Sequence, residues 1–494
     1  MLSLDLLPEG TLLPHYDRQA LRPRIVHLGF GAFHRSHQAV CADILASEHG
    51  SDWGYCECEI NKTNQGHLVN ALRQQDWLYS VSEMADDGVT TRVVGVVRQA
   101  FYRSEEGIEK IIAAMSQPDI AIVSITVTEK GYCYQPSSGQ LMRDHPAVVH
   151  DLAHPDDPES VPGVILAAIR RRRSLGLKPF SVMSCDNMPE NGHVTRNVVV
   201  QLAEQQDAEL ASYIRQHISF PSTMVDRIVP AMTEQDFTGL AERLGCTDPV
   251  GVQCEPFFQW VIEDNFVNGR PAWEKAGAEL VADVLPFEEM KLRMLNGSHS
   301  FLAYLGGLAG YQHISDCMQD AHFEQAARRL MLDEQAPTLR TKDVDLSAYA
   351  DSLIARYKNR AIRHRTHQIA TDGSQKLPQR WLDSIRWHLN NGSDFQWLAL
   401  GVAGWMRFVS GTDEQGQPIV INDPLKPELA QLVSNSEDGE ARIAALLSLN
   451  AVFGDDLPDS SRFRTAVSRC YQLLREQGAK ETVRQLNSQG HSVV

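Results

Sequence analysis

The hydrophobic pattern divides the chain into two unlike halves, and the first half alternates between short apolar runs and amphipathic segments. Four apolar runs read as strands: residues 24–28, 53–60, 120–128 and the start of 179–192. The β-branched run IAIVSITVT at 120–128 is typical of a strand buried in a parallel sheet. Helices are expected between the runs, at residues 37–48 and 106–115. This alternation predicts an α/β, Rossmann-like domain.

From residue 287 onward, short apolar runs typical of strands become rare, and apolar residues recur at helical spacing. Helices are expected at residues 301–308, 323–334, 346–357, 379–389, 394–408, 438–447 and 460–477, several of them separated by Gly and Pro. A chain of 494 residues is too long for one ordinary core. We therefore expect a Rossmann-like dinucleotide-binding domain at residues 1–286 and a mainly α-helical domain at residues 287–494. The cleft between two such domains is a usual place for a substrate.

The first expected strand runs into a glycine turn, and a helix follows the turn. The turn consists of Gly29, Phe30, Gly31, Ala32, Phe33 and His34. Strand, glycine turn and helix in this order present backbone N–H groups to a pyrophosphate. The pattern is GxGxxH and lacks the third glycine, so a plain strand-to-helix turn is the alternative.

An acidic residue near the end of the second expected strand bears on the choice of cofactor. Glu57 and Glu59 follow Gly29 by 28 and 30 residues, whereas the usual spacing is about 20. A carboxylate there bonds the ribose hydroxyls and disfavours a 2′-phosphate, which favours NAD (NADH) over NADP. Which of the two glutamates does so stays open. Thr128 ends a further expected strand, where a cofactor should also be met.

The segment FEEMKLRMLNGSHS at residues 287–300 concentrates polar side chains in one expected helix. At about 100° per residue, Glu288 lies about 60° to one side of Lys291 and His299 about 80° to the other, while Asn296 lies at about 140°. Lys291, Glu288 and His299 can therefore share a face, with Asn296 at its margin. A buried lysine has a lowered pKa and can act as a base. The alternative is a solvated helix face.

Two further polar positions follow apolar runs in the first half. Within residues 179–192 an apolar strand ends in Cys185, Asp186 and Asn187, and a turn follows. Asn187 is there either a turn or cap residue or a donor to a developing oxyanion. Asp226 and Arg227 lie between short apolar pieces, and we expect an ion pair there.

Composition excludes several classes of protein. The net charge of −17 argues against nucleic acid or an anionic membrane as the main partner. No signal peptide and no run of about 18 apolar residues is found. Nine scattered cysteines fit reduced thiols in a cytoplasmic enzyme. His364 and His367 have a suggestive spacing, but no matched ligands accompany them, and we expect no metal.

Six motifs together resemble those of the polyol-specific long-chain dehydrogenases, the mannitol dehydrogenase family. They are GFGAFHRSHQA (29–39), SITVTEKGY (124–132), SCDNMPENG (184–192), MVDRI (224–228), KLRMLNGSHS (291–300) and DGSQKLPQR (372–380), in family order over residues 24–475. The resemblance implies a Rossmann-like domain, a helical domain and metal-independent hydride transfer with NAD(P). GxGxxH is the family's own pattern.

The resemblance also implies roles for individual residues. It makes Lys291 the catalytic acid/base, Asn187 and Asn296 the oxyanion donors, His299 the residue that orients the substrate and Glu288 the proton relay. It makes Lys376 a substrate contact.

The substrate is expected to be a sugar acid or a polyol. Residues 255–271 and 363–380 resemble family members that interconvert D-mannonate and D-fructuronate in hexuronate catabolism. For the carboxylate we expect Arg365 and Lys376, with Arg363 behind them, because arginine binds carboxylates in a bidentate manner. Solvent-facing basic residues are the alternative. Asp226 is a further expected substrate contact.

Two other functions compete with this interpretation. One is a neutral polyol dehydrogenase acting on mannitol or arabinitol, and the other is a non-catalytic NAD-binding regulator. A regulator has no need of the base that Lys291 supplies. We expect a monomer or a weak homo-oligomer.

Overall fold

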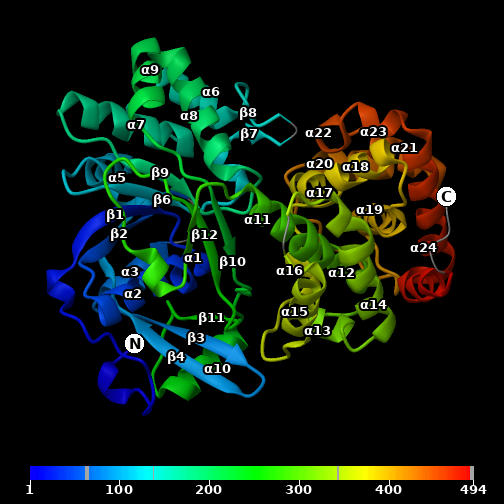
Figure 1. The fold of residues 1–494 in the computed structure, drawn as a ribbon, viewed down its shortest axis with the longest axis horizontal. Coiled ribbons are helices and arrows are strands. Elements are labelled where there is room, and N and C mark those ends of the chain that lie inside the picture. Colours follow the sequence, from blue (N-terminus) through cyan, green and yellow to red (C-terminus); the bar gives the residue numbers. More distant parts are fainter. Residues whose placement is uncertain (62–65, 137, 342–343, 490–494) are drawn as a thin grey trace. The chain divides into compact units, whose positions relative to one another are not determined.

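The computed structural model describes residues 1–61, 66–136, 138–341 and 344–489. The chain forms two compact units: unit 1 comprises Met1–Gln135 and Gly139–Leu285, and unit 2 comprises Pro136–Ser138 and Pro286–Val494. Unit 1 is built on a parallel sheet and unit 2 is helical (Figure 1). The predicted fold class is confirmed.

The main sheet of unit 1 has five strands, all paired in parallel with their neighbours. Their order is β5 (Val97–Tyr102), β2 (Trp53–Glu59), β1 (Arg22–Leu28), β6 (Ile122–Ile125) and β9 (Ser181–Ser184). The chain moves from β1 to β2 on one side and later to β6 on the other side. The strand order therefore reverses beside β1. In open α/β sheets, ligands bind at such a point, outside the carboxyl ends of the strands.

Alternate residues of the strands enter two hydrophobic cores, as the period of a strand requires. Val26, Leu28 and Val123 belong to the core shared with α5 (Ile108–Met115), α7 (Val161–Ser174) and α8 (Asn191–Gln206). Ile25 and Ile122 belong to the core shared with α2 (Gln38–His49) and α3 (Gly66–Gln74). Helices thus cover both faces of the sheet, and both faces are apolar.

Further strands of unit 1 form smaller sheets. One has the order β10 (Thr223–Asp226), β12 (Gln259–Glu263), β13 (Glu279–Val281), and another has the order β11 (Val252–Cys254), β3 (Tyr79–Ala85), β4 (Gly88–Val94). A hairpin joins β7 (Tyr134–Gln135) and β8 (Gln140–Leu141). The other helices of unit 1 are α1 (Ala32–Ser36), α4 (Arg103–Glu106), α6 (Pro146–Ala153), α9 (Ala208–His217) and α10 (Glu234–Leu244).

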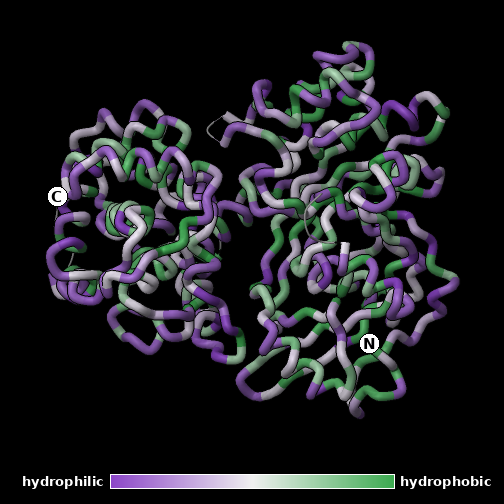
Figure 2. The backbone as a smooth tube through the Cα atoms, turned by 180° about the vertical axis from the view of Figure 1, so that it is seen from behind, coloured by the Kyte–Doolittle hydropathy of each residue, from purple (hydrophilic) through white to green (hydrophobic). Residues whose placement is uncertain are grey.

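Unit 2 is organised around α12 (Gly297–Leu308), every residue of which is buried. α12 packs against α19 (Gln396–Val409), and α19 packs against α24 (Ser461–Ser488), which is kinked at Gly478. The outer helices in Figure 2 alternate between hydrophilic and hydrophobic residues along their length, as helices with one buried face do. The remaining α-helices are α11 (Leu285–Met290), α13 (Ile314–Cys317), α14 (Ala321–Arg329), α15 (Leu346–Lys358), α16 (Thr366–Ile369), α17 (Gly373–Leu377), α18 (Asp383–Asn391), α20 (Lys426–Ser434), α21 (Glu440–Leu447), α22 (Asn450–Phe453) and α23 (Asp456–Asp459).

Three of the predicted helical segments contain π-helical turns. These turns are η5 (Lys291–Asn296), η6 (Leu330–Gln335) and η8 (Pro378–Leu382). η5 packs against both η6 and η8. A π-helix has i→i+5 hydrogen bonds, is rare and is frequent at functional sites. The assumption of regular α-helical spacing through residues 291–296 is therefore wrong.

No described helix is both long enough and apolar enough to cross a membrane. All nine cysteines lie in the described part of the chain, and none of them forms a disulfide there.

Candidate active site

The glycine turn after β1 requires glycine at its first position. Gly29 has φ +103°, and a Cβ there would lie 2.0 Å from the carbonyl oxygen of Thr126. A Cβ on Gly31 would meet nothing within 4 Å. Gly31 therefore faces open space next to the start of α1, where a ligand can approach the backbone closely.

A cavity of about 440 Å³ opens beside this turn. It is lined by Gly29, Gly31, Glu59, Ile60, Asn61, Thr126, Val127, Thr128, Lys130, Gly131, Cys133, His145, Ala147, Glu159, Ser160 and Val161. Four of the predicted cofactor residues, Gly29, Gly31, Glu59 and Thr128, therefore lie around one cavity at the point where the strand order of the sheet reverses.

The two candidate glutamates occupy different environments. Glu59 lines the cavity, and its carboxylate accepts a hydrogen bond from the N–H of Asn61 at 2.8 Å. Burial raises the pKa of the Glu59 carboxyl group. Glu57 is fully buried, and its Oε1 lies 2.7 Å from Nε2 of His34. The geometry therefore favours Glu59 over Glu57 as the residue that meets a ligand.

Of the other turn residues, Ala32 and Phe33 are half-buried, whereas Phe30 and His34 are fully buried. The ring of His34 stacks on His27 with 3.4 Å between centroids. His34 thus stands at the position of the missing third glycine, and its buried contacts with His27 and Glu57 hold the turn in place.

Among the described residues, His27, His34 and Glu57 form one group that could hold a metal ion. The ring nitrogens of His27 already bond the hydroxyls of Ser124 and Thr126. The two imidazole planes are also nearly parallel, 12° apart. We read the group as a buried hydrogen-bond network, since every ring nitrogen of its two histidines already has a protein partner.

The remaining predicted residues of unit 1 follow strand ends. Asn187 is exposed and comes three residues after β9 ends. Asp226 is buried and ends β10. The next residue, Arg227, forms an ion pair with Glu83 and donates to the carbonyl oxygen of Glu255.

In unit 2, four predicted catalytic residues lie in the continuous segment α11–η5–α12. Lys291, Glu288, Asn296 and His299 are all buried, with exposed fractions of 3%, 4%, 6% and 8%. Lys291 begins the π-helical turn and Asn296 ends it. In a turn with i→i+5 bonds, residues five apart lie on about the same side. The π-helix therefore brings Asn296 from the margin of the predicted face towards the side of Lys291.

The neighbouring carboxylate, Glu289, is close to two arginines. Glu289 pairs with Arg340 at 3.2 Å and lies 4.0 Å from Arg293. Arginines therefore neutralise Glu289.

Several polar atoms of this region are buried without a hydrogen-bond partner in the described part of the chain. They are Nδ2 of Asn296, Nε2 of His299, Nδ1 of His364, Oε1 of Gln375 and Oε1 of Gln379. Each such group costs about 1–3 kcal/mol if it remains unsatisfied. Donors and acceptors of this kind, gathered in one region, are suited to a ligand with many hydroxyl groups.

The two histidines of this region are in contact. His299 stacks on Tyr357 with 5.3 Å between centroids and meets the ring of His364 edge-on at 4.5 Å. Burial lowers the pKa of His299 well below its ordinary value and that of His364 to about 3, and Lys376 contributes to both shifts. Both rings are therefore neutral at pH 7. His364 is therefore a further candidate site residue, which the sequence analysis noted only for its spacing from His367.

The predicted carboxylate partners differ in exposure. Lys376 is half-buried, and its Nζ donates to the carbonyl oxygen of Ile369 at 3.3 Å. Arg363 and Arg365 are exposed. The structure thus places Lys376 near the two histidines, and it leaves the arginines at the surface.

The π-helical turns are tied together by side chains that the sequence did not single out. Arg380 donates to the carbonyl oxygen of Asn296 at 3.3 Å and to Oγ of Ser300 at 2.7 Å. Trp381 donates to the carbonyl oxygen of Gly297 at 3.0 Å, and Gln335 donates to that of Arg380 at 2.7 Å. These contacts hold the segment that carries Asn296 and His299.

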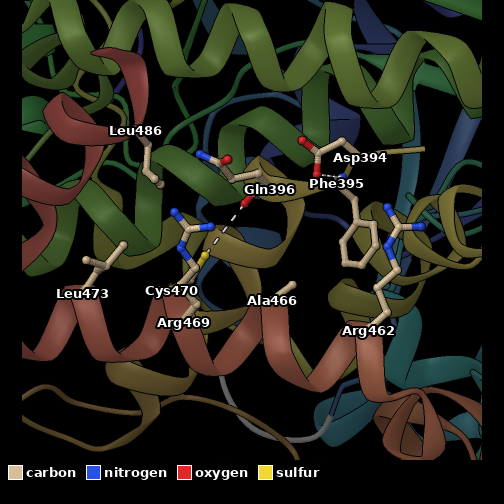
Figure 3. Close-up of a pocket in the computed structure, with 9 residues that line it drawn as sticks. All are labelled: Asp394, Phe395, Gln396, Arg462, Ala466, Arg469, Cys470, Leu473 and Leu486. Atoms are coloured by element: carbon tan, nitrogen blue, oxygen red, sulfur yellow. Dashed lines mark hydrogen bonds between the residues drawn. The ribbon is translucent and has the colours of Figure 1, made fainter. Parts of the chain in front are cut away.

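A separate pocket of unit 2 lies between α19 and α24 (Figure 3). Figure 3 shows its lining residues Arg462, Ala466, Arg469, Cys470 and Leu473 along one helix, facing Asp394, Phe395 and Gln396. Its volume is about 20 Å³, which is room for about one water molecule. It contains none of the predicted site residues, and we do not assign a substrate to it.

Comparison with known proteins covers almost the whole chain. The mannitol dehydrogenase Rossmann domain matches residues 23–275, and the mannitol dehydrogenase C-terminal domain matches residues 283–475.

Individual relatives give the same picture. The chain is 60% identical to the uncharacterized oxidoreductase YdfI of Escherichia coli (strain K12), over 97% of this chain and 98% of that protein. It is 51% identical to the D-mannonate oxidoreductase of the same organism, over 95% and 97%. The mannitol 2-dehydrogenase of Pseudomonas fluorescens, solved as a ternary complex with NAD and D-mannitol, is 39% identical and covers 98% of both chains with a TM-score of 0.94.

Both domain matches and full-length relatives above 30% identity lead to one assignment. The chain belongs to the mannitol dehydrogenase family of oxidoreductases, which act on CH–OH groups.

Proposed function

We propose that this oxidoreductase interconverts D-mannonate and D-fructuronate with NAD as cofactor and Lys291 as general acid/base. The observation that carries the proposal is the segment α11–η5–α12. There a buried lysine shares one π-helical turn with Asn296, and His299 follows in α12. Nδ2 of Asn296 and Nε2 of His299 have no partner in the described part of the chain.

The cavity of unit 1 suits a dinucleotide. Gly31 leaves room for a pyrophosphate against the backbone, and Glu59 stands at the carboxyl end of β2, where ribose hydroxyls are bonded. The relative from Pseudomonas fluorescens was solved with NAD, which supports the same cofactor here. A carboxylate at Glu59 repels a 2′-phosphate, so NAD is preferred over NADP. When bound, NAD⁺ supplies the hydride acceptor.

In the oxidation of the alcohol, neutral Lys291 accepts the hydroxyl proton while the hydride leaves the same carbon. Asn187 and Asn296 donate hydrogen bonds to that oxygen as negative charge develops, which stabilises the transition state more than the alcohol. His299 bonds the same or a neighbouring oxygen and fixes its direction. In the reduction, the ketone oxygen takes the proton back from protonated Lys291.

Glu288 passes the proton between Lys291 and solvent. It precedes Lys291 by three residues and is buried. Because a side chain performs every proton step, the scheme is metal-independent.

The sugar-acid substrate rests on two observations. Identity to the D-mannonate oxidoreductase is 51%, and the region between residues 363 and 376 is rich in basic side chains. Lys376, close to His299 and His364, and Arg365 are the proposed partners of the substrate carboxylate, and Asp226 is a proposed contact to a hydroxyl group.

A neutral polyol dehydrogenase is the second candidate. Several mannitol 2-dehydrogenases are 36–37% identical to the chain, and the structural match to the Pseudomonas fluorescens enzyme is close. The same Lys291 machinery serves both reactions, so the two candidates differ in the substrate alone.

Consumption of NADH by the purified protein, measured with fructuronate, tagaturonate and fructose, separates the candidates. The proposal predicts the highest kcat/KM for fructuronate. A preference for fructose would establish the neutral polyol enzyme instead. Absence of turnover on all three would contradict both.

A further inference from the structure

The loop that follows β6 is held in a backbone conformation that its sequence disfavours. Thr128 has φ +65° and ψ +165°, a region that is essentially restricted to glycine. A β-branched residue persists there only where the surroundings impose it. Val127, Thr128, Lys130 and Gly131 of this loop line the cavity of unit 1. The imposed backbone therefore shapes the wall of the candidate cofactor site.

One carboxylate makes the contacts that hold the loop. Oδ1 of Asp186 accepts the N–H of Thr128 at 2.9 Å, and Oδ2 accepts the N–H of Val127 at 3.0 Å. Oδ2 also accepts the hydroxyl of Tyr132 at 2.5 Å. Hydrogen bonds to an ionised acceptor are about twice as strong as neutral ones. Both ends of the strained loop segment thus converge on a single side chain.

Asp186 is itself firmly placed at the end of β9. It is buried, its N–H donates to Oγ of Ser184 at 3.3 Å, and its carbonyl oxygen accepts Nδ2 of Asn191 at 3.2 Å. The hydroxyl groups of Tyr132 and Ser184 are 2.7 Å apart, which closes the network. The residue after Asp186 is Asn187, the proposed oxyanion donor of unit 1.

We propose that Asp186 is a positioning residue that sets the Val127–Thr128 backbone against the cofactor and fixes the chain that presents Asn187. The proposal rests on the proposed function, because it assigns Asp186 a task within the same NAD-dependent reaction. Asp186 is not among the residues that line the cavity, so in this proposal it acts through its neighbours.

The charge state of Asp186 provides an independent readout. Burial raises the pKa of the Asp186 carboxyl to about 7, although its hydrogen bonds to Tyr132, Val127 and Thr128 oppose that shift. The other titratable groups that interact with it are Glu129, Cys185 and Tyr134. A protonated carboxyl has less acceptor capacity than a carboxylate, so the loop should loosen as the pH falls below 7.

The test compares Asp186→Asn with Asp248→Asn as the matched control. Asp248 is also buried and accepts the N–H groups of Ser80 and Val250 and the hydroxyl of Ser80, but it does not line the cavity. Two quantities are measured for the full chain: amide hydrogen exchange of residues 126–134, and the Kd of NADH from fluorescence titration at pH 6 and pH 8. Tyr132→Phe, which keeps the carboxylate, serves as a milder second variant.

We expect Asp186→Asn to speed exchange at residues 126–134 and to raise the Kd of NADH about tenfold, which is the loss of about one charged hydrogen bond. Tyr132→Phe should raise that Kd by a smaller factor. The Kd of the wild type should be higher at pH 6 than at pH 8, and the Kd of Asp186→Asn should change less between these pH values than that of the wild type. Asp248→Asn should leave both the local exchange and the Kd as in the wild type.

Two results would overturn the proposal and can be told apart. A wild type that does not bind NADH removes the proposed function, and the role of Asp186 with it. A wild type that binds NADH, together with an Asp186→Asn variant of unchanged Kd or unchanged local exchange, removes the role of Asp186 alone.

Discussion

Around the cavity of unit 1, the described lining residues leave no buried side-chain nitrogen or oxygen without a hydrogen-bond partner. In unit 2, by contrast, Asn296, His299, His364, Gln375 and Gln379 each carry a buried polar atom without one in the described part of the chain. The loop of unit 1 is held by Asp186. The unpartnered groups of unit 2 are suited to the oxygen atoms of a substrate.

This difference suggests two ways of preparing a binding site before its ligand arrives, one for the cofactor and one for the substrate. A cofactor with a fixed shape can be met by backbone that protein contacts already hold. A transition state is best met by donors whose partner arrives with the substrate, because such donors stabilise developing charge without first breaking an internal hydrogen bond. The predictions below test this contrast between a preformed and an unsatisfied site.

Replacement of Lys291 by alanine should have the largest effect. Loss of a general acid/base typically costs about 10²- to 10⁴-fold in rate, and we expect kcat to fall in that range while the Kd of NADH stays close to that of the wild type. Steady-state kinetics and NADH titration measure the two quantities. Lys358→Ala is the control, since that lysine pairs with Glu324 at the surface. Near-normal turnover of Lys291→Ala would refute the assignment.

Asn296→Ala and Asn187→Ala should follow. Removal of one oxyanion donor typically costs about 3–4 kcal/mol, so kcat should fall by about 10²- to 10³-fold with little change in KM. Initial rates over a range of substrate concentrations separate kcat from KM. A rise in KM alone would show that the two amides bind the ground state.

Two titratable groups, Asp186 of unit 1 and His364 of unit 2, should contribute pH-dependent stability of opposite sign. Folded Asp186 keeps its proton up to about pH 7, whereas an unfolded aspartate loses it near pH 3.9. Between these values the unfolded state binds fewer protons, so this term in the unfolding free energy falls as the pH rises. Folded His364 has a pKa of about 3, below its unfolded value of about 6.5, so its term rises with pH.

The two contributions are measured as differences in the free energy of unfolding between the wild type and variants. Chemical denaturation at pH 5 and at pH 6.5 gives that free energy for each protein. Relative to the wild type, Asp186→Asn should gain up to about 2 kcal/mol between the two pH values, and His364→Gln should lose up to about 2 kcal/mol. Differences that do not change with pH would contradict the sign assigned to Asp186 and to His364.

The smallest expected effect concerns the substrate carboxylate. Arg365→Ala should lower kcat/KM for mannonate about tenfold more than for mannitol, since an ionic hydrogen bond is worth about 1.5–3 kcal/mol and exposure weakens it. Arg464→Ala, at another exposed position, is the control. Equal losses on both substrates would remove Arg365 from the carboxylate site.

Continuous apolar runs in the sequence predicted four of the five strands of the main sheet, and β5 (Val97–Tyr102) was missed. The strands observed at Arg22–Leu28, Trp53–Glu59 and Ser181–Ser184 lie within or beside the predicted segments. β3 and β4 were also missed. Only continuous apolar runs were taken as strands, and these two antiparallel strands contain polar residues, as in TTRVV.

Unit 2 shows the limit of periodicity as a guide. Residues 287–300, 323–334 and 379–389 are helical as predicted, but each segment contains a π-helical turn. No local residue pattern predicts such a turn, since it depends on distant contacts such as Arg380 to Asn296 and Gln335 to Arg380. The same limit hid the role of Asp186, whose partners are 54 to 59 residues away in the chain.

In the proposed reaction, substrate oxygen atoms bond the unpartnered groups of unit 2. A crystal structure of the ternary complex with NADH and mannonate tests it most directly. We expect one substrate oxygen within hydrogen-bond distance, about 2.6–3.2 Å, of both Nζ of Lys291 and Nδ2 of Asn296. His299 should bond the same oxygen or the next one. Mannonate bound elsewhere, with Asn296 and His299 still without partners, would contradict it.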